Sequence, residues 1–266
     1  MSIFDQDTQI EKTDQPHLYH AQLSKRWANR DICNGGYVMA IAAKAMADIL
    51  PHPDPLSITG YYLDKTEPGL TDIHVESIRE GKNVSTASAK VLQGGTERVR
   101  LIASYTDIDK PSGETFLEEE PPTPLAIEQC QLFLEPKVEA YSRIDLYLPP
   151  NFKENRGQAG NKSELIGWVK FKEGGEPDLF SLMFFADALP PVVFNRTGPV
   201  GWVPTIELTI HLRAKPKPGV LKFRLKTRYL SNGTLEEDGD IWDSEGNLVA
   251  LSRQMAKFRL PPNKKK

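Results

Sequence analysis

The sequence predicts an α+β protein in which two antiparallel sheets each wrap around a long helix and pack together as a pseudo-dimer. One observation is that a buried helix followed by four strand-like runs occurs twice along the 266 residues. A second is that the two copies align without gaps at an offset of 150 residues, which places Pro68-Gly69 on Pro218-Gly219. Few identities recur, but the apolar positions coincide, and their spacing decides which residues face a core. Because the period is too long for a solenoid repeat, we interpret the chain as two similar domains fused together.

The first copy is predicted as an N-terminal domain over residues 1–108. Residues 17–24 predict a short strand, because Leu18 and His20 alternate with Tyr19, Ala21 and Leu23. The segment 34–50 begins with Asn-Gly-Gly, is rich in Ala, Met and Ile, and ends before a proline, which predicts a helix buried on most sides. Four strand-like runs follow, separated by glycine-containing turns, at 56–64, 71–80, 83–93 and 97–107.

A surface connector is predicted over residues 109–137, because this stretch holds a proline cluster and an acidic run. The C-terminal domain is predicted over residues 138–266. Its buried helix is expected at 178–189, where Pro190-Pro191 stops it. The strand-like segments of this domain lie at 144–148, 165–169, 203–213, 220–230, 235–243 and 247–259.

The composition argues against several classes of protein. The formal net charge is −3 and no basic stripe alternates with aromatic residues, so nucleic acid is not an expected partner. No apolar run approaches about 18 residues, so no membrane span is expected, and the acidic N-terminal residues do not resemble a signal peptide. The two cysteines are too few for a disulfide framework, which favours a reducing compartment. A cytoplasmic location is therefore expected.

Common catalytic motifs are missing from the sequence. It contains no G-x-S-x-G nucleophile elbow, no P-loop, no H-E-x-x-H and no paired C-x-x-C. The five histidines are scattered, without the spacing of a metal site. Neither a metal ion nor a cofactor is expected.

Three polar residues lie in apolar surroundings. Asp187 is enclosed by LMFFADALPP, where a carboxylate needs a hydrogen-bond partner, and capping of a nearby backbone amide would explain it as well. Gln254 shares the phase of the apolar face of the last strand, where an inward amide usually bonds only to backbone. Thr205 is out of phase with the apolar residues that follow it, and a threonine in a strand is usually structural.

The order of these three residues resembles the acyl-CoA thioesterase II family, within the broad thioesterase-like superfamily. The resemblance runs from Asn34 to Leu260 and is most specific in FFADAL, WVPTIELTIHLR and LVALSRQM. It implies a double hotdog fold, with two domains that each curl a sheet around a helix. Carried over residue by residue, it implies catalytic roles for Asp187, Thr205 and Gln254.

The resemblance also implies one active site per chain. The 150-residue offset places Pro55 opposite Thr205 and Ser104 opposite Gln254, so the first copy lacks both polar groups. As a hypothesis, Asp187 accepts a proton from the water that attacks an acyl thioester such as acyl-CoA, while the other two side chains hold that water. A backbone amide near the start of the second helix is the expected oxyanion donor.

Substrate-binding residues are harder to identify. Residues that fit the wall of an acyl pocket, and fit core packing equally well, are Met183, Phe184, Phe185 and Trp202. Residues that fit the phosphates of coenzyme A, and fit surface solubility equally well, are Arg196, Arg213, Lys215 and Lys217. The fused pair can exist as a monomer, and relatives commonly assemble further, so a homodimer is a possible partner arrangement.

Two other functions stay open. One is a hotdog hydratase or dehydratase on acyl thioesters, which would need a histidine near the carboxylate. His211 is the only histidine of the second domain, and its spacing of six residues from Thr205 places both on one face of a regular strand. The other is a non-catalytic protein that binds an acyl or polyketide group.

Overall fold

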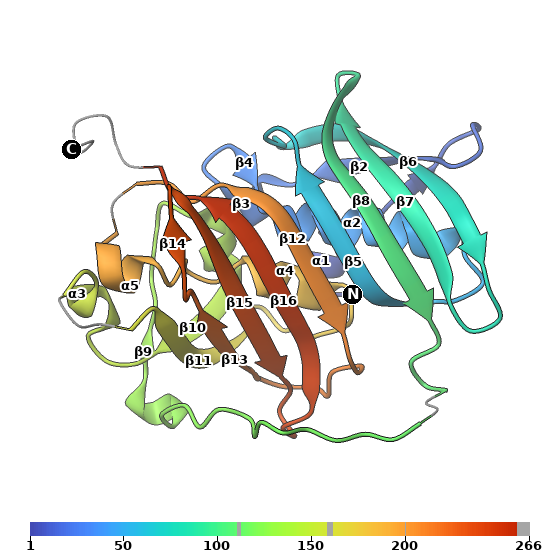
Figure 1. Ribbon diagram of the computed structural model, residues 1–266. Coiled ribbons are helices and arrows are strands. Elements are labelled where there is room, and N and C mark those ends of the chain that lie inside the picture. Colours follow the sequence, from blue (N-terminus) through green and yellow to red (C-terminus); the bar gives the residue numbers. More distant parts are fainter. Residues whose placement is uncertain (111–112, 159–161, 200, 260–266) are drawn as a thin grey trace.

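The computed structural model describes residues 1–110, 113–158, 162–199 and 201–259. The end of the predicted second domain, residues 260–266, lies outside the described residues. The fold is dominated by a largely antiparallel sheet with few helices (Figure 1). No helix in the described residues is long and apolar enough to cross a bilayer.

The predicted two sheets are joined into one, which corrects the expectation from the sequence. Within the described residues, the sheet contains 14 strands in the order β1-β2-β6-β7-β8-β5-β12-β16-β15-β13-β11-β10-β9, and β14 pairs with β15. The strands of its first half are β1 (Glu11–Lys12), β2 (Leu18–Leu23), β5 (Asp54–Tyr62), β6 (Gly69–Glu80), β7 (Ser85–Gln93) and β8 (Thr96–Thr106). Those of its second half are β9 (Gln131–Leu132), β10 (Ile144–Leu148), β11 (Glu164–Phe171), β12 (Thr205–Leu212), β13 (Leu221–Lys226), β14 (Leu230–Ser231), β15 (Thr234–Trp242) and β16 (Leu248–Lys257). A separate two-stranded ribbon consists of β3 (Ala28–Asn29) and β4 (Ile32–Cys33).

The two halves meet where β5 pairs with β12. The register is symmetric about Thr59 and Thr209, because Ile58 pairs with Ile210 and Gly60 pairs with Leu208. The hydroxyls of Thr59 and Thr209 are 2.9 Å apart, and these residues are separated by 150 positions. Each strand thus pairs with its counterpart at the offset found in the sequence, and the pairing removes two edges that would otherwise be exposed.

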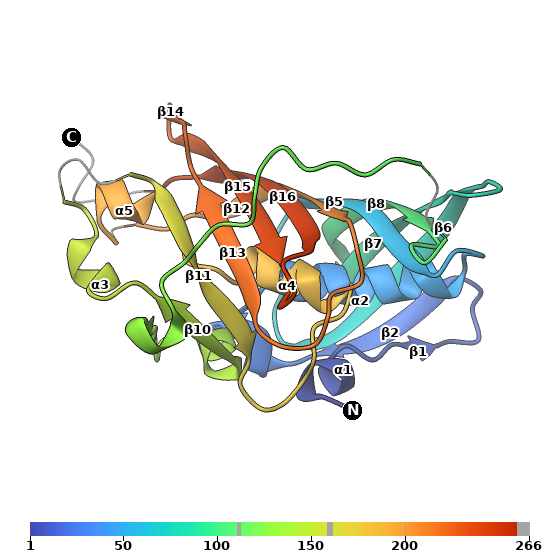
Figure 2. The ribbon, with the colours of Figure 1, turned by 90° about the horizontal axis from the view of Figure 1, so that it is seen from below.

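Two helices lie end to end on one face of this sheet (Figure 2). Helix α2 (Gly35–Asp48) begins at Asn34, whose side-chain oxygen accepts a hydrogen bond from the backbone N–H of Tyr37. Helix α4 (Ser181–Asp187) is shorter than the predicted 178–189. Most side chains of α2 are buried, as its Ala- and Met-rich sequence predicts.

Gly36 allows α2 and α4 to touch. A Cβ atom at this position would lie 2.1 Å from the carbonyl oxygen of Met183 and 2.9 Å from the Cβ of Asp187. Such distances are far below van der Waals contact, so the two helix backbones approach this closely only because residue 36 has no side chain. The C-terminal end of α4 is therefore fixed against the first turn of α2.

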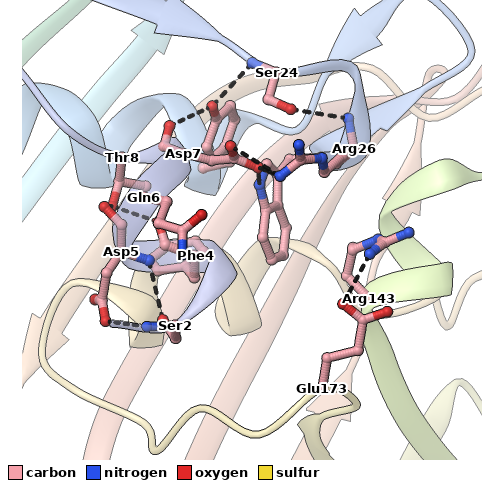
Figure 3. Close-up of polar contacts among 12 residues, drawn as sticks. Ser2, Phe4, Asp5, Gln6, Asp7, Thr8, Ser24, Arg26, Arg143 and Glu173 are labelled. Carbon is pink, nitrogen blue, oxygen red and sulfur yellow. Dashed lines mark hydrogen bonds and ion pairs between the residues drawn. The ribbon is translucent and has the colours of Figure 1, made fainter.

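A short N-terminal helix, which the sequence did not predict, packs against both halves, and Figure 3 shows polar contacts of its residues. Helix α1 (Ile3–Asp7) has a capping box between Ser2 and Asp5. The carboxylate of Asp7 accepts a hydrogen bond of 2.8 Å from the indole of Trp27, at the end of the 3₁₀ helix η1 (Lys25–Trp27). Phe4 packs against aromatic rings from both halves, namely Trp27, Phe171 and Phe184.

The predicted connector follows the surface at first and then enters the sheet (Figure 1). Residues 113–120 are exposed, as expected. Later in the same stretch, β9 pairs with β10 and Phe133 is buried, so the end of this stretch belongs to the sheet. The remaining short helices are η2 (Ile127–Gln129), η3 (Glu139–Arg143), α3 (Phe152–Asn155) and α5 (Phe194–Thr197).

Candidate active site

The three polar residues singled out in the sequence lie together on the helix-covered face of the sheet. The amide nitrogen of Gln254 on β16 donates to the hydroxyl of Thr205 on β12 over 2.5 Å. The same nitrogen lies 3.3 Å from Oδ1 of Asp187, at the C-terminal end of α4. Gln254 pairs with the buried Leu208, so its amide points inward as the strand phase predicts.

A β-bulge turns Thr205 toward the other two residues. On β12, Thr205 pairs with Ala256 and Glu207 pairs with Met255, so Ile206 is an extra residue without a partner. Ile206 is 39% exposed, whereas Thr205 shares the inner face with the buried Ala256. Thr205 therefore faces the same side as Leu208, although their spacing in the sequence would place them on opposite faces of a regular strand. A bulge can re-aim a side chain in this way beside a functional site.

The carboxylate of Asp187 is held by the first turn of α2, across the junction of the two halves. Its Oδ2 accepts hydrogen bonds from Asn34 Nδ2 at 2.8 Å and from the backbone N–H of Gly36 at 3.0 Å. Asn34 also caps α2 through its side-chain oxygen, which fixes the amide so that its nitrogen faces Asp187. The sequence identified Asn34 and Gly36 only as the start of a helix, although the Asn-Gly-Gly run was a visible signal.

These surroundings set the protonation of Asp187. Burial raises its pKa to about 6, and the donors from Gly36, Gly35 and Asn34 act in the opposite direction. A carboxylate with this pKa is mostly ionised at neutral pH and is still a competent proton acceptor. Since Oδ2 is bound to α2, Oδ1 is the oxygen that faces Gln254.

A buried carboxylate, which sequence reasoning missed, lies beside Gln254. Glu237 on β15 pairs with Gln254 and is only 8% exposed. Its Oε2 accepts hydrogen bonds from the backbone N–H of Val192 at 2.8 Å and from the hydroxyl of Thr227 at 3.2 Å. Burial, with smaller contributions from Asp187 and another carboxylate, raises the pKa of Glu237 to about 7. Glu237 thereby ties the loop after α4 to the sheet.

The predicted pocket residues are found in different surroundings. Met183 and Phe184 are fully buried, and Phe184 packs edge-on against Trp27 with ring centroids 4.9 Å apart. Their position fits core packing, and their role in an acyl pocket stays a prediction. Trp202 is 42% exposed and bridges to Arg259, just before β12.

Two of the predicted phosphate-binding residues lie in different segments, Arg196 on α5 and Lys215 in the loop after β12. Arg196 is exposed on α5. Lys215 forms ion pairs with Asp54 at 3.1 Å and with Asp109 at 2.5 Å, so its charge is already balanced within the protein. A role for these two residues at coenzyme A stays a prediction.

His211 does not share a face with Thr205, contrary to the sequence-based expectation. It is exposed and pairs with Ser57, on the outer side of the sheet. The spacing of six residues predicted one face for a regular strand, but the bulge at Ile206 reverses that relation. His211 thus lies across the sheet from Asp187.

The outer side of the sheet carries a groove under the connector. Its volume is about 760 Å³, and its lining includes Phe116 and Glu119 of the connector with Arg224 and Asp240 of the strands. Neither this groove nor a smaller one beside Phe152 is lined by Asp187, Thr205 or Gln254. The candidate site and these grooves are separate features.

Comparison with known families gives two matches along the chain. The model of the acyl-CoA thioesterase N-terminal domain matches residues 23–106. The model of the acyl-CoA thioesterase C-terminal domain matches residues 117–257, which include all three polar residues of the candidate site.

Comparison with individual proteins gives similarities over nearly the whole chain. A candidate thioesterase II from Thermobifida fusca has a TM-score of 0.89 and 28% identity, with coverage of 97% of this chain and 98% of its own. A hot dog fold protein of unknown function from Alicyclobacillus acidocaldarius has a TM-score of 0.86 and 18% identity, with coverage of 98% and 99%. The thioesterase-like protein TwmA of Talaromyces wortmannii is 22% identical, over 96% of this chain and 91% of its own length.

Proposed function

Because this chain belongs to the acyl-CoA thioesterase family, we propose that it hydrolyses an acyl thioester, with acyl-CoA as the substrate class. The observation that carries the proposal is the convergence of Asp187, Thr205 and Gln254, which come from three separate elements. Thioester hydrolysis needs a positioned water, a proton acceptor and an oxyanion donor. The cluster offers groups for the first two of these tasks.

In the proposed mechanism, Asp187 Oδ1 accepts a proton from a water molecule held by Thr205 and Gln254. The water oxygen bonds to the carbonyl carbon, and the electron pair of the C=O π bond moves to the oxygen as an oxyanion. When the C=O bond re-forms, the C–S bond breaks, and the thiolate takes the proton from Asp187. The products are a carboxylic acid and a free thiol. A base placed in this way contributes about 10²–10⁴-fold to the rate.

The proposal includes two hotdog units with one active site. The positions at the 150-residue offset from Thr205 and Gln254 are Pro55 and Ser104, which cannot supply the same groups. The amide donors to Asp187 come from the first unit and the other polar groups from the second. The cytoplasmic location and the homodimer expected from the sequence stay predictions.

The competing functions have less support from the contacts. A hydratase or dehydratase would need a histidine beside the carboxylate, and His211 points to the opposite side of the sheet. A non-catalytic acyl-binding protein would not need a half-buried carboxylate with a raised pKa beside an amide and a hydroxyl. We therefore place hydrolysis first.

The test is release of free thiol from a panel of acyl-CoAs of different chain length. The wild-type protein is expected to hydrolyse at least one of them. Asp187→Asn is expected to lose about 10²–10⁴-fold in kcat, because the amide keeps an oxygen for Asn34 and Gly36 but cannot accept the proton.

The matched control is Asp31→Asn, since Asp31 is an exposed carboxylate outside the site. It is expected to keep wild-type activity, and both variants are expected to keep a cooperative thermal unfolding transition. Full activity in a folded Asp187→Asn variant would remove Asp187 from the mechanism. Consumption of an enoyl-CoA without thiol release would favour the hydratase function instead.

A further inference from the structure

Tyr62 adds a polar side chain from the first half of the chain to the surroundings of the candidate site. It is the last residue of β5, and its neighbour Tyr61 pairs with Glu207 of β12. In this antiparallel register, Tyr62 lies beside the residues that precede Glu207, at the bulge that turns Thr205 inward. Adjacent strands β5, β12 and β16 therefore place Tyr62, Thr205 and Gln254 next to one another.

The ring of Tyr62 lies against the first turn of α2. Its Cε1, Cζ and hydroxyl oxygen would be 2.7, 2.8 and 2.9 Å from a Cβ at Gly35. The next residue, Gly36, donates its N–H to Asp187. The tyrosine ring thus passes beneath the same helix turn that holds the carboxylate.

The hydroxyl of Tyr62 is buried and has no hydrogen-bond partner among the described residues. Leaving a polar group buried and unpaired costs about 1–3 kcal/mol. Phenylalanine would fill the same space without that cost, so the hydroxyl needs another explanation. A hydroxyl that finds no partner among the described protein groups and lies beside the candidate site is suited to bind a substrate atom.

We propose that the Tyr62 hydroxyl donates a hydrogen bond to the carbonyl oxygen of the thioester and to the oxyanion that replaces it. This inference rests on the proposed hydrolysis and supplies the oxyanion donor that the three clustered residues do not provide. Thr205 and Gln254 hold the water on one side of the carbonyl carbon, while Tyr62 receives the oxygen from the neighbouring strand. As the water adds, negative charge grows on that oxygen and the hydrogen bond strengthens.

The electrostatic surroundings keep this hydroxyl protonated. Burial, together with the carboxylates of Asp187 and Glu207, raises the pKa of Tyr62 well above its ordinary value. The hydroxyl therefore keeps its proton at neutral pH, where Asp187 is mostly ionised. It can donate a hydrogen bond but does not act as the base.

The first experiment measures hydrolysis by Tyr62→Phe, which removes the hydroxyl and leaves the ring on Gly35. The expected result is a fall of about 10²–10³-fold in kcat, as for other oxyanion donors, with a rise in KM of at most about tenfold from the lost hydrogen bond to the ground-state carbonyl. The melting temperature is expected to stay the same or rise, because the lost hydroxyl has no partner among the described residues. Tyr61→Phe is the matched control, since Tyr61 is adjacent and 52% exposed, and it is expected to behave as wild type.

A second measurement separates oxyanion binding from a structural role. The dissociation constant is measured for two stable analogues of an acyl-CoA that wild type hydrolyses. One has a methylene group in place of sulfur and keeps the carbonyl, and the other is an S-alkyl coenzyme A without a carbonyl. Tyr62→Phe is expected to weaken binding of the ketone by about tenfold, a typical hydrogen-bond effect, and to leave binding of the thioether unchanged.

The outcomes distinguish the two proposals. A folded Tyr62→Phe variant with kcat within twofold of wild type would overturn the role of Tyr62, while loss of activity in Asp187→Asn would leave the hydrolase function standing. Equal weakening of ketone and thioether binding would also overturn it, because the hydroxyl would then act through structure alone. A wild-type protein that hydrolyses no acyl-CoA would overturn both proposals.

Discussion

Asp187 is subject to two opposing influences, and each has a different source. Burial at the end of α4 disfavours the charged form, while the donors of α2 favour it, and the pKa settles at about 6. Since this value lies above the ordinary value of 3.8, ionisation in the folded state is harder than in the unfolded chain. The contribution of Asp187 to the free energy of unfolding is therefore fully present below about pH 4 and is lost as the pH rises through about 6. The proposed base destabilises the fold at the pH where it works.

The same balance predicts a pH dependence of hydrolysis. The value of kcat/KM is expected to rise with pH, with a midpoint at about 6, and to level about one pH unit higher, because the ionised carboxylate is the active form. Asn34→Ser is expected to move the midpoint upward, since serine still caps α2 but loses the donor to Asp187. Measuring kcat/KM from about pH 5 to about pH 8 for both proteins checks this.

Glu237 ionises in the same range, so the measured midpoint belongs to both carboxylates. Glu237→Gln keeps an oxygen for the backbone N–H of Val192 and serves as the control that isolates Asp187. A midpoint that moves downward in Asn34→Ser would show that the amide does not stabilise the charged form of Asp187.

At the scale of single elements, the bulge of β12 decides which side chain enters the site. Exchanging the two residues, in the double variant Thr205→Ile and Ile206→Thr, keeps the composition but moves the hydroxyl to the exposed position. We expect kcat to fall about 10²-fold, and the same fall in Thr205→Val, because the water loses one of its ligands. Steady-state kinetics on the acyl-CoA preferred by the wild type provides the measurement.

Ile206→Thr alone is the control for the exchange and is expected to keep full activity, since residue 206 faces outward. Wild-type activity in the exchanged variant would mean that the strand pairs again without the bulge, with the relocated threonine turned inward. That result would contradict the account of how the strand presents its hydroxyl.

Much of the element pattern could be predicted from periodicity and turn residues. Helix α2 and the eight long strands lie within a few residues of their predicted ranges, because apolar alternation and glycine turns are local signals. The joined sheet, the bulge at Ile206 and the contact at Gly36 depend on pairing between distant segments, which periodicity does not report. The predicted cluster of Asp187, Thr205 and Gln254 came from a family resemblance, whereas Tyr62 and Glu237 needed the register.

At the scale of the whole molecule, the two halves share irregularities as well as strand order. The bulge between Thr205 and Glu207 has a counterpart between Pro55 and Ser57 at the same offset of 150 residues. A second pair of register shifts lies between Val91 and Leu92 in the first half and between Ile241 and Trp242 in the second. These matches support the proposal that residues 1–108 and 138–266 are duplicated domains. The first copy therefore has the same bulge, but the residue that aligns with Thr205 is Pro55, which has no hydroxyl.

The contacts between the halves predict that the connector is not needed to hold them together. A protease site inserted between the exposed Leu117 and Glu118 allows the chain to be cut after folding. We expect the cut protein to elute as one particle in size-exclusion chromatography and to keep its hydrolytic activity. The reason is that the β5–β12 pairing and the contact of α2 with α4 lie outside the connector.

The uncut protein with the same inserted site is the control. Separation of two fragments, or loss of activity with the fragments still associated, would show that the connector itself supports the junction. Thr59→Val is expected to leave the cut protein intact, because the backbone pairing of the two strands does not depend on one hydroxyl contact.

The contact at Gly36 has a consequence for the order of events during synthesis. On the proposed assignment, a ribosome that has released only the first half of the chain has produced the amide cradle but no carboxylate for it to hold. The proton acceptor emerges later, and its oxygen finds its ligands only once the second half has docked. Hydrolytic competence would then arrive at the last step of maturation, so that an unfinished polypeptide is inert toward the cell's thioesters.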